Sequence, residues 1–96
     1  MARTIGILIF DDAEEMDFVG PWEVLTSATD DLPGEKVVLI AEHAGPVTCQ
    51  KGMRVIPDCT YADAPPLDVL LIPGGSGARR EIGNPATVGW LNAASA

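Results

Sequence analysis

The sequence predicts an α/β fold in which helices cover a parallel sheet. Three apolar runs, at residues 4–10, 36–41 and 67–72, lack the alternation of a half-exposed strand. Continuous apolar character of this kind is typical of strands buried on both faces of a parallel sheet. A segment with helical spacing lies between the first two runs, which favours a right-handed βαβ unit at the start of the chain.

The first strand, residues 4–10, is expected in the centre of the sheet and ends in the acidic segment 11–15. We predict that a helix begins at Pro21, because proline suits the first position of a helix. The apolar residues of one face of this helix are Trp22, Leu25 and Ala28. Residues 30–34 are a cluster of helix breakers that ends the helix before the strand at 36–41.

The middle of the chain predicts a hairpin and a loop before the third apolar run. Residues 47–49 and 53–56 are bracketed by Gly-Pro and Lys-Gly pairs, which favours an antiparallel hairpin appended at an edge of the sheet. Residues 58–66 are expected to form a loop. The strand at 67–72 is expected to be central and stops at the turn Pro73-Gly74-Gly75. Ligands of open α/β sheets bind beyond the carboxyl ends of strands, so this turn is the expected place for chemistry.

Two helical segments are predicted after the glycine turn. Residues 78–82 form a single helical turn before Gly83, and Asn84-Pro85 supplies the cap and the first residue of a second helix. The alternation of strands and helices then calls for a further parallel strand, which residues 1–96 do not contain. We therefore interpret residues 1–96 as one partial domain.

Composition and charge exclude several classes of function. With 47% apolar and 21% charged residues the chain has ordinary globular composition, and its net charge of −8 disfavours nucleic acid and anionic membrane as partners. An apolar stretch of about 18 residues and a signal-peptide pattern are both missing, so the default location is cytoplasmic. Cys49 and Cys59 match neither a redox motif nor, with His43, a zinc site, and we interpret them as small buried residues.

Five motifs occur in an order that resembles the amino-terminal half of the ThiJ/PfpI superfamily, and within it the isocyanide hydratases and the sensor domains of AraC-type regulators. The motifs are Ile5-Gly6-Ile7-Leu8-Ile9-Phe10, Met16-Asp17-Phe18-Val19-Gly20-Pro21, Gly45-Pro46-Val47, Ala64-Pro65-Pro66-Leu67-Asp68-Val69 and Ile72-Pro73-Gly74-Gly75. The resemblance implies a flavodoxin-like, doubly wound sheet with an appended hairpin, usually in a homodimer. The carboxyl-terminal part of that domain, with its nucleophile elbow, would lie outside residues 1–96.

The resemblance also implies an active site with three components. One is a cysteine on a strand-to-helix elbow, which the resemblance implies at the end of a strand that would begin just past Ala96. Cys49 and Cys59 are not candidates, because neither follows a buried strand into a helix. The second is an acidic residue after the first strand, a position that Asp17 occupies. The third is the oxyanion-binding or substrate-binding turn, in which Gly74 and Gly75 supply backbone amides. Trp22 packs against the core or lines the pocket.

The chemistry expected of Asp17 depends on its surroundings. Closed over by apolar neighbours, the carboxyl would be partly desolvated, which disfavours its charged form and suits a general acid. The apolar neighbours are Met16, Phe18 and Trp22. The other acidic residues of this region are expected to be solvated surface charges rather than metal ligands, namely Asp11, Asp12, Glu14 and Glu15. We expect His43 at the surface, and Arg79-Arg80 facing solvent or a dimer partner.

These observations leave three interpretations open. The first is a cysteine-dependent hydratase or hydrolase of a small electrophile, similar to isocyanide hydratases, that turns an isonitrile into an N-formamide with no metal and no organic cofactor. The second is the ligand-sensing domain of an AraC-type regulator, which a helix-turn-helix past Ala96 would indicate. The third is a catalytically dead chain that pairs with another copy or with a complementing carboxyl-terminal fragment.

Overall fold

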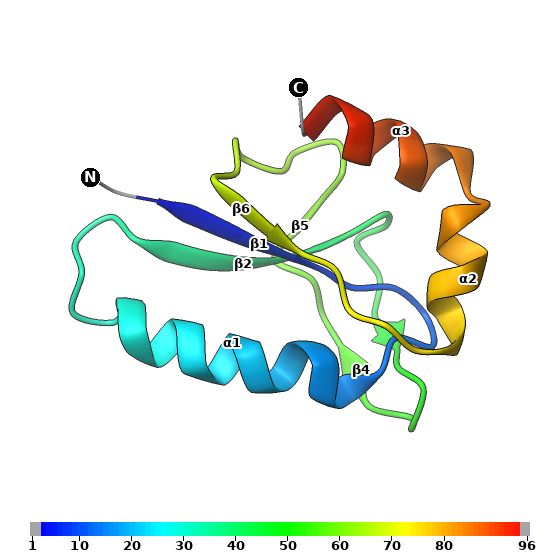
Figure 1. Ribbon diagram of the computed structural model, residues 1–96, viewed down its shortest axis with the longest axis horizontal. Helices are drawn as coiled ribbons and strands as arrows, with labels where there is room; N and C mark the ends of the chain where they lie inside the picture. The colour runs from blue at the N-terminus through cyan, green and yellow to red at the C-terminus, as the bar shows by residue number, and fades with distance from the viewer. Residues whose placement is uncertain (1–2, 95–96) are drawn as a thin grey trace.

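The fold is built around β1 (Thr4–Leu8), which occupies an interior position in a parallel sheet (Figure 1). The computed structural model describes residues 3–94. The strand pairs in parallel with β2 (Lys36–Ala41) on one side and with β6 (Val69–Leu71) on the other. The predicted α/β sheet and the central place of its first strand are therefore confirmed.

The core forms where helices cover both faces of β1. Ile7, Leu8 and Ile9 are almost wholly buried. The helix α1 (Glu15–Thr29) lies on one side of the sheet and α3 (Pro85–Ala94) on the other (Figure 1). This double cover explains why the first apolar run does not alternate.

The strand β6 lies at an edge of the sheet, which corrects the prediction that it is central. Within residues 3–94 its only partner is β1, and the order of strands is β5-β2-β1-β6. Val69 is 51% exposed and Ile72 is 54% exposed. An apolar pocket of about 230 Å³ beside the strand is lined by Ile72, Leu91 and other residues of β1 and the two carboxyl-terminal helices. The apolar run therefore correctly predicted a strand with the composition of a buried strand. It could not show that, within residues 3–94, a partner strand lies on one side of it only.

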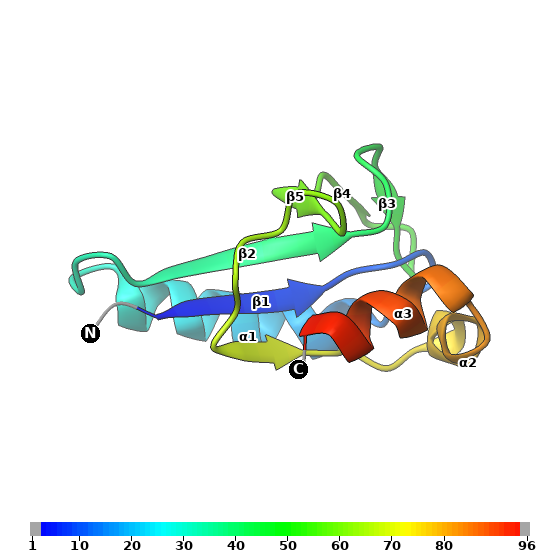
Figure 2. The ribbon, with the colours of Figure 1, turned by 90° about the horizontal axis from the view of Figure 1, so that it is seen from above.

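The predicted hairpin is confirmed, whereas the predicted loop after it contains a strand. β3 (Val47–Thr48) pairs antiparallel with β4 (Arg54–Val55) as a small separate sheet past the carboxyl end of β2 (Figure 2). Residues Cys59–Thr60 form β5, which pairs in parallel with the end of β2. A strand of two residues is too short to leave a periodic pattern in the sequence.

The helix α1 begins at Glu15, six residues before the predicted start, so that Pro21 lies inside it. The predicted face of this helix is also wrong, because Trp22 and Ala28 are exposed and Phe18 is the buried residue. The carboxylate of Glu15 accepts hydrogen bonds from the backbone N–H groups of the hairpin turn. These tertiary contacts anchor the first turn and override the preference of proline for the first helical position.

The two carboxyl-terminal helices are close to their predictions. α2 spans Ser76–Ile82 and begins two residues earlier than expected. α3 begins at Pro85, and the side-chain oxygen of Asn84 accepts a hydrogen bond from the Ala86 N–H at 3.1 Å. The cap-and-proline signature therefore identified the start of α3 correctly.

Candidate functional site

The loop after β1 and the turn after β6 are joined by backbone hydrogen bonds. The N–H of Glu14 donates to the carbonyl of Gly74 at 3.0 Å, and the N–H of Gly77 donates to the carbonyl of Asp12 at 3.1 Å. Between these two bonds, the N–H of Gly74 donates to Oδ2 of Asp17 at 3.0 Å. The structure thus brings together two of the residues that the sequence placed in one site.

Asp17 lies in the first turn of α1, where the partial positive charge of a helix N-terminus favours a carboxylate. The predicted burial of this side chain is wrong, because Asp17 is exposed, Met16 is 73% exposed and Trp22 is 38% exposed. Phe18 is buried, but in the core of the sheet. Asp17 is therefore a solvent-accessible carboxylate that is oriented by one backbone amide.

The backbone at Gly75 requires glycine. Its φ is 110°, a left-handed value that side chains rarely adopt. A Cβ at this position would overlap the backbone N of Glu14 and lie 2.7 Å from the carbonyl oxygen of Asp12. The close approach of the two loops therefore depends on the missing side chain. Gly75 is exposed, and its N–H donates none of the hydrogen bonds found among residues 3–94.

The hairpin reaches the same site through Gln50. Its N–H donates to the carbonyl of Ala13 at 2.9 Å, and its Oε1 accepts a hydrogen bond from the N–H of Ser76 at 2.8 Å. Gln50 therefore connects the loop after β1 with the turn after β6. Sequence reasoning missed this residue, because a single glutamine in a hairpin turn carries no signal of a long-range contact.

The acidic residues around Asp17 make contacts that the sequence did not predict, although Asp11 is exposed and Asp12 is about half-exposed, as expected of surface charges. Asp11 accepts a hydrogen bond from the N–H of Thr48 at 3.1 Å. Asp12 pairs with Arg80 at 3.2 Å, and Glu14 pairs with Lys51. Each carboxylate thus holds the loop after β1 against a segment distant in sequence.

The two arginines of α2 and His43 follow their predictions. Arg79 and Arg80 are both exposed, as predicted, and Arg80 in addition bonds to the loop after β1. The His43 side chain is 84% exposed, as predicted, and lies 3.5 Å from Glu42. Across the described residues, no three His, Cys, Asp or Glu side chains are grouped as a metal ion would need.

Neither cysteine of the chain is suited to act as a nucleophile. Burial raises the pKa of Cys49, and the nearby charges of Glu15 and Asp11 raise it further. Burial also raises the pKa of Cys59. A raised pKa keeps a thiol protonated at neutral pH, whereas the thiolate is the reactive form. Cys49 is buried, as predicted, whereas Cys59 is only partly buried.

Trp22 lies apart from the Asp17–Gly74 contact. It lines an apolar pocket of about 220 Å³ between α1 and the hairpin, and neither Asp17 nor Gly74 is among the lining residues. The other lining residues are Phe18, Val19, Leu39, Met53 and Val55. Of the two alternatives for Trp22, the structure places it in this separate apolar pocket.

Glu15 makes the attachment of the hairpin dependent on pH. Burial alone would raise the pKa of Glu15, but backbone N–H groups, including those of Met53 and Lys51, and the Lys51 ammonium outweigh it and lower the pKa. A lowered pKa in the folded chain means that this contribution to stability is complete above the unfolded value and is lost as the pH falls. We expect the free energy of unfolding to decrease below about pH 4.

The variant Glu15→Gln should remove part of this pH dependence, because glutamine does not titrate. Chemical unfolding at a series of acidic pH values measures the effect. Glu23→Gln is the matched control, since Glu23 is exposed on the same helix. Equal pH profiles for the two variants would contradict the role of Glu15.

Comparison with known proteins shows which proteins have sequences similar to this chain. Residues 3–93 match the DJ-1/PfpI family. The chain is 40% identical to isonitrile hydratase of Pseudomonas putida over 77 residues, which are 80% of this chain and 32% of the relative. It is 32% identical to glutathione-independent glyoxalase DJR-1.2 of Caenorhabditis elegans over 72 residues, which are 73% of this chain and 36% of that protein.

Solved structures show the same fold. A ThiJ/PfpI family protein from Pseudomonas syringae superimposes with a TM-score of 0.81 and 28% identity, over 95% of this chain and 37% of the other. The chain therefore spans roughly a third of the length of these three relatives. Among the helices of residues 3–94, none combines the length and the apolar composition that a membrane crossing requires.

Proposed function

This chain belongs to the DJ-1/PfpI family, and on that basis we propose that it forms part of the active site of a cysteine-dependent hydratase that converts an isonitrile into an N-formamide. The reactive thiol comes from a segment outside residues 3–94. The observation that carries the proposal is the hydrogen bond from the Gly74 N–H to Asp17, together with the identity to an isonitrile hydratase. The substrate is a small molecule, and the reaction uses no metal and no organic cofactor.

The roles of the residues follow from their geometry. Among the described residues, Oδ2 of Asp17 accepts the Gly74 N–H, whereas Oδ1 has no protein donor. Oδ1 therefore exchanges the proton with substrate or water. Gly75 is an exposed residue, and its N–H, which donates none of the backbone hydrogen bonds found among residues 3–94, stabilises negative charge that develops on the substrate. A thiol between these two groups completes the site.

The reaction balances without a co-reactant other than water. The thiolate adds to the isonitrile carbon and forms a C–S bond, and that carbon takes a proton delivered through Asp17. Water, deprotonated by the Asp17 carboxylate, then adds to the same carbon. The nitrogen takes the proton that Asp17 received from this water, and the C–S bond breaks as the hydroxyl proton passes to the departing sulfur, which gives the N-formamide and the regenerated thiol.

The open edge of β6 supplies a place for the segment with the thiol. The outer edge of this strand has no partner strand within residues 3–94, and apolar surface adjoins it. A parallel strand added there would end beside Gly74 and Gly75, because the carboxyl ends of parallel strands meet at one edge of the sheet. We propose that a complementing carboxyl-terminal part, in the same or a second polypeptide, occupies this edge, and that the completed protein assembles as a homodimer.

A reconstituted protein tests the proposal. It joins residues 1–96 to the part of the Pseudomonas putida isonitrile hydratase that lies beyond the matched region. We expect this protein to hydrate a model isonitrile, with the formamide measured by chromatography, and the 96-residue chain alone to be inactive. The control replaces the elbow cysteine of the added part by alanine and should abolish turnover.

The same assay separates the competing functions. A folded reconstituted protein that leaves the isonitrile unchanged but is active in a glyoxalase assay would assign the chain to the chemistry named for the Caenorhabditis elegans relative. A folded protein that is inactive in both assays but binds a small molecule would favour the ligand-sensing alternative. Either result would overturn the hydratase proposal.

A further inference from the structure

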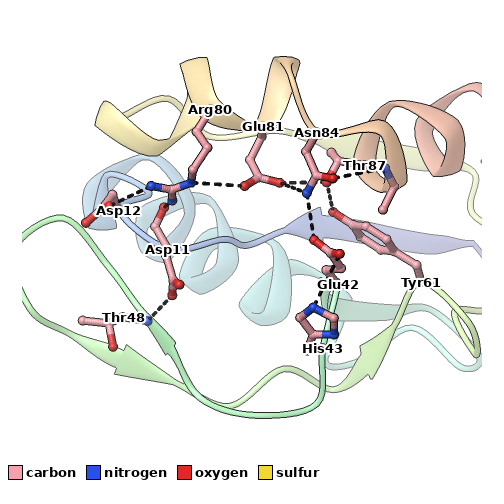
Figure 3. A network of polar contacts seen from close by, with 11 residues as sticks. Asp11, Asp12, Glu42, His43, Thr48, Tyr61, Arg80, Glu81, Asn84 and Thr87 are labelled. Carbon is pink, nitrogen blue, oxygen red and sulfur yellow. Dashed lines mark hydrogen bonds and ion pairs between the residues drawn. The ribbon is translucent and has the colours of Figure 1, made fainter.

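Arg80 connects α2 with the loop that precedes Asp17 (Figure 3). Its Nη2 donates to the carbonyl oxygen of Asp11 at 2.6 Å, and its Nη1 donates to the carboxylate of Asp12 at 3.2 Å. A guanidinium is planar and presents its N–H donors at fixed angles. Contacts with two adjacent residues therefore fix the orientation of this loop as well as its position.

The loop that Arg80 holds has an unusual backbone. Asp12 has a φ of 65°, in the left-handed region that residues other than glycine seldom occupy. Its N–H donates to the carbonyl of Thr48 at 2.8 Å, and its carbonyl accepts the Gly77 N–H at 3.1 Å. Such conformations persist where surrounding contacts fix them. Arg80 binds the one part of Asp12 that these backbone bonds leave free, its carboxylate.

The guanidinium of Arg80 also pairs with the carboxylate of Glu81, its neighbour in the sequence (Figure 3). Their side chains approach to 3.7 Å, and the hydroxyl of Thr87 donates to Glu81 at 2.7 Å. Because this hydroxyl has a single hydrogen, the Tyr61 hydroxyl, 2.9 Å away, must donate to it. Burial raises the pKa of Tyr61, which keeps it a donor, and its ring stacks on Trp90 with centroids 4.6 Å apart.

We propose that Arg80 is a positioning residue that, by fixing the loop after β1, sets the Asp17 carboxylate against the Gly74 amide. The loop continues directly into Glu14, whose N–H is bonded to Gly74. A displacement of the loop is therefore transmitted to the first turn of α1. The half-exposed ion pair adds little energy, so the contribution of Arg80 is geometric.

Nuclear magnetic resonance of the isotope-labelled 96-residue chain tests the positioning without any activity. In Arg80→Met we expect the Gly74 amide resonance to shift and its hydrogen exchange to accelerate. In the control Arg79→Met both should match the parent, because Arg79 lies next to Arg80 on the same helix but, among residues 3–94, only Arg80 of the pair bonds to the loop after β1. The Gly89 amide in α3 serves as an internal reference. Equal behaviour of the Gly74 amide in the two variants would overturn the proposal.

A kinetic test rests on the proposed function and uses the reconstituted protein. Arg80→Met should lower kcat about 10- to 100-fold, because small misplacements of a reacting group are costly. KM should stay within about twofold, since substrate contacts are unchanged. An active protein whose kcat is unaffected by Arg80→Met would overturn the positioning role. An inactive parent with the expected Gly74 shift would refute the hydratase proposal and leave the positioning intact.

If Arg80→Met does not fold, a second pair of variants, Arg80→Lys and Arg79→Lys, tests the same proposal. Arg80→Lys retains the charge but lacks the planar fork that reaches both Asp11 and Asp12. It should shift the Gly74 amide more than Arg79→Lys does. If the two lysine variants give the same Gly74 resonance, the proposal is wrong.

Discussion

Gly77→Ala should lower the free energy of unfolding by about 3 kcal/mol, as expected for overpacking at a rigid site. Gly77 is buried in the first turn of α2, and a Cβ there would overlap the carbonyl oxygen of Asp11. The backbone conformation at Gly77 is one that alanine tolerates, so the cost is steric. The obstructing atom is backbone in a loop that several hydrogen bonds hold, and it cannot rotate away. Urea unfolding with an unchanged m value measures the loss.

Gly89→Ala is the matched control for this prediction. Gly89 lies inside α3, and a Cβ there would meet nothing within 4 Å. Alanine in an exposed helix interior is preferred over glycine by about 1 kcal/mol. The same substitution is therefore expected to stabilise the chain at one position and destabilise it at the other. Destabilisation of similar size in both variants would show that the contact between α2 and the loop after β1 is not tight.

Asp17→Asn should lower kcat of the reconstituted protein about 10²- to 10⁴-fold, which is the usual contribution of a general acid or base. Asparagine keeps the shape of the side chain, and its amide oxygen still accepts the hydrogen bond that Gly74 donates. The variant therefore removes the proton transfer while it preserves the geometry. Asp17→Ala removes both and should be no more active. Steady-state kinetics with a model isonitrile measure both variants.

The control for Asp17 is Asp31→Asn, which removes the same charge from an exposed position beyond the end of α1. This variant should retain parental kcat and KM. If Asp17→Asn also hydrated the isonitrile at the parental rate, Asp17 would have no role in proton transfer. The contact between Asp17 and Gly74 would then be structural.

Sequence reasoning predicted those features that depend on short-range patterns. The unbroken apolar run at β1 identified a buried strand, and Asn84-Pro85 identified the start of α3, because each signal is complete within a few residues. The contact of Asp17 with Gly74 was expected from the family resemblance, and the hydrogen bond between them agrees with it. Their catalytic roles stay predictions.

The features that sequence reasoning missed depend on long-range contacts. Arg79 and Arg80 are chemically identical in the sequence, and only the fold shows that Arg80 meets a carbonyl 69 residues away. The start of α1 was misplaced because the anchoring of Glu15 by the hairpin outweighs the local preference of Pro21. The expected burial of Asp17 failed for a similar reason, since apolar neighbours in sequence do not cover the carboxyl in space.

The hydrogen bond between Asp17 and Gly74 joins residues that are 57 positions apart, which has a consequence for folding kinetics. The pairing of β1 with β2 joins residues that are nearer in sequence, so the segment from β1 through α1 to β2 can collapse early. Docking of β6 onto β1 must wait until a much longer loop has closed, and such nonlocal pairings slow the folding of a chain. We therefore expect amide protection at Gly74 to develop in the last kinetic phase, after that of the interior amides of β1 and β2.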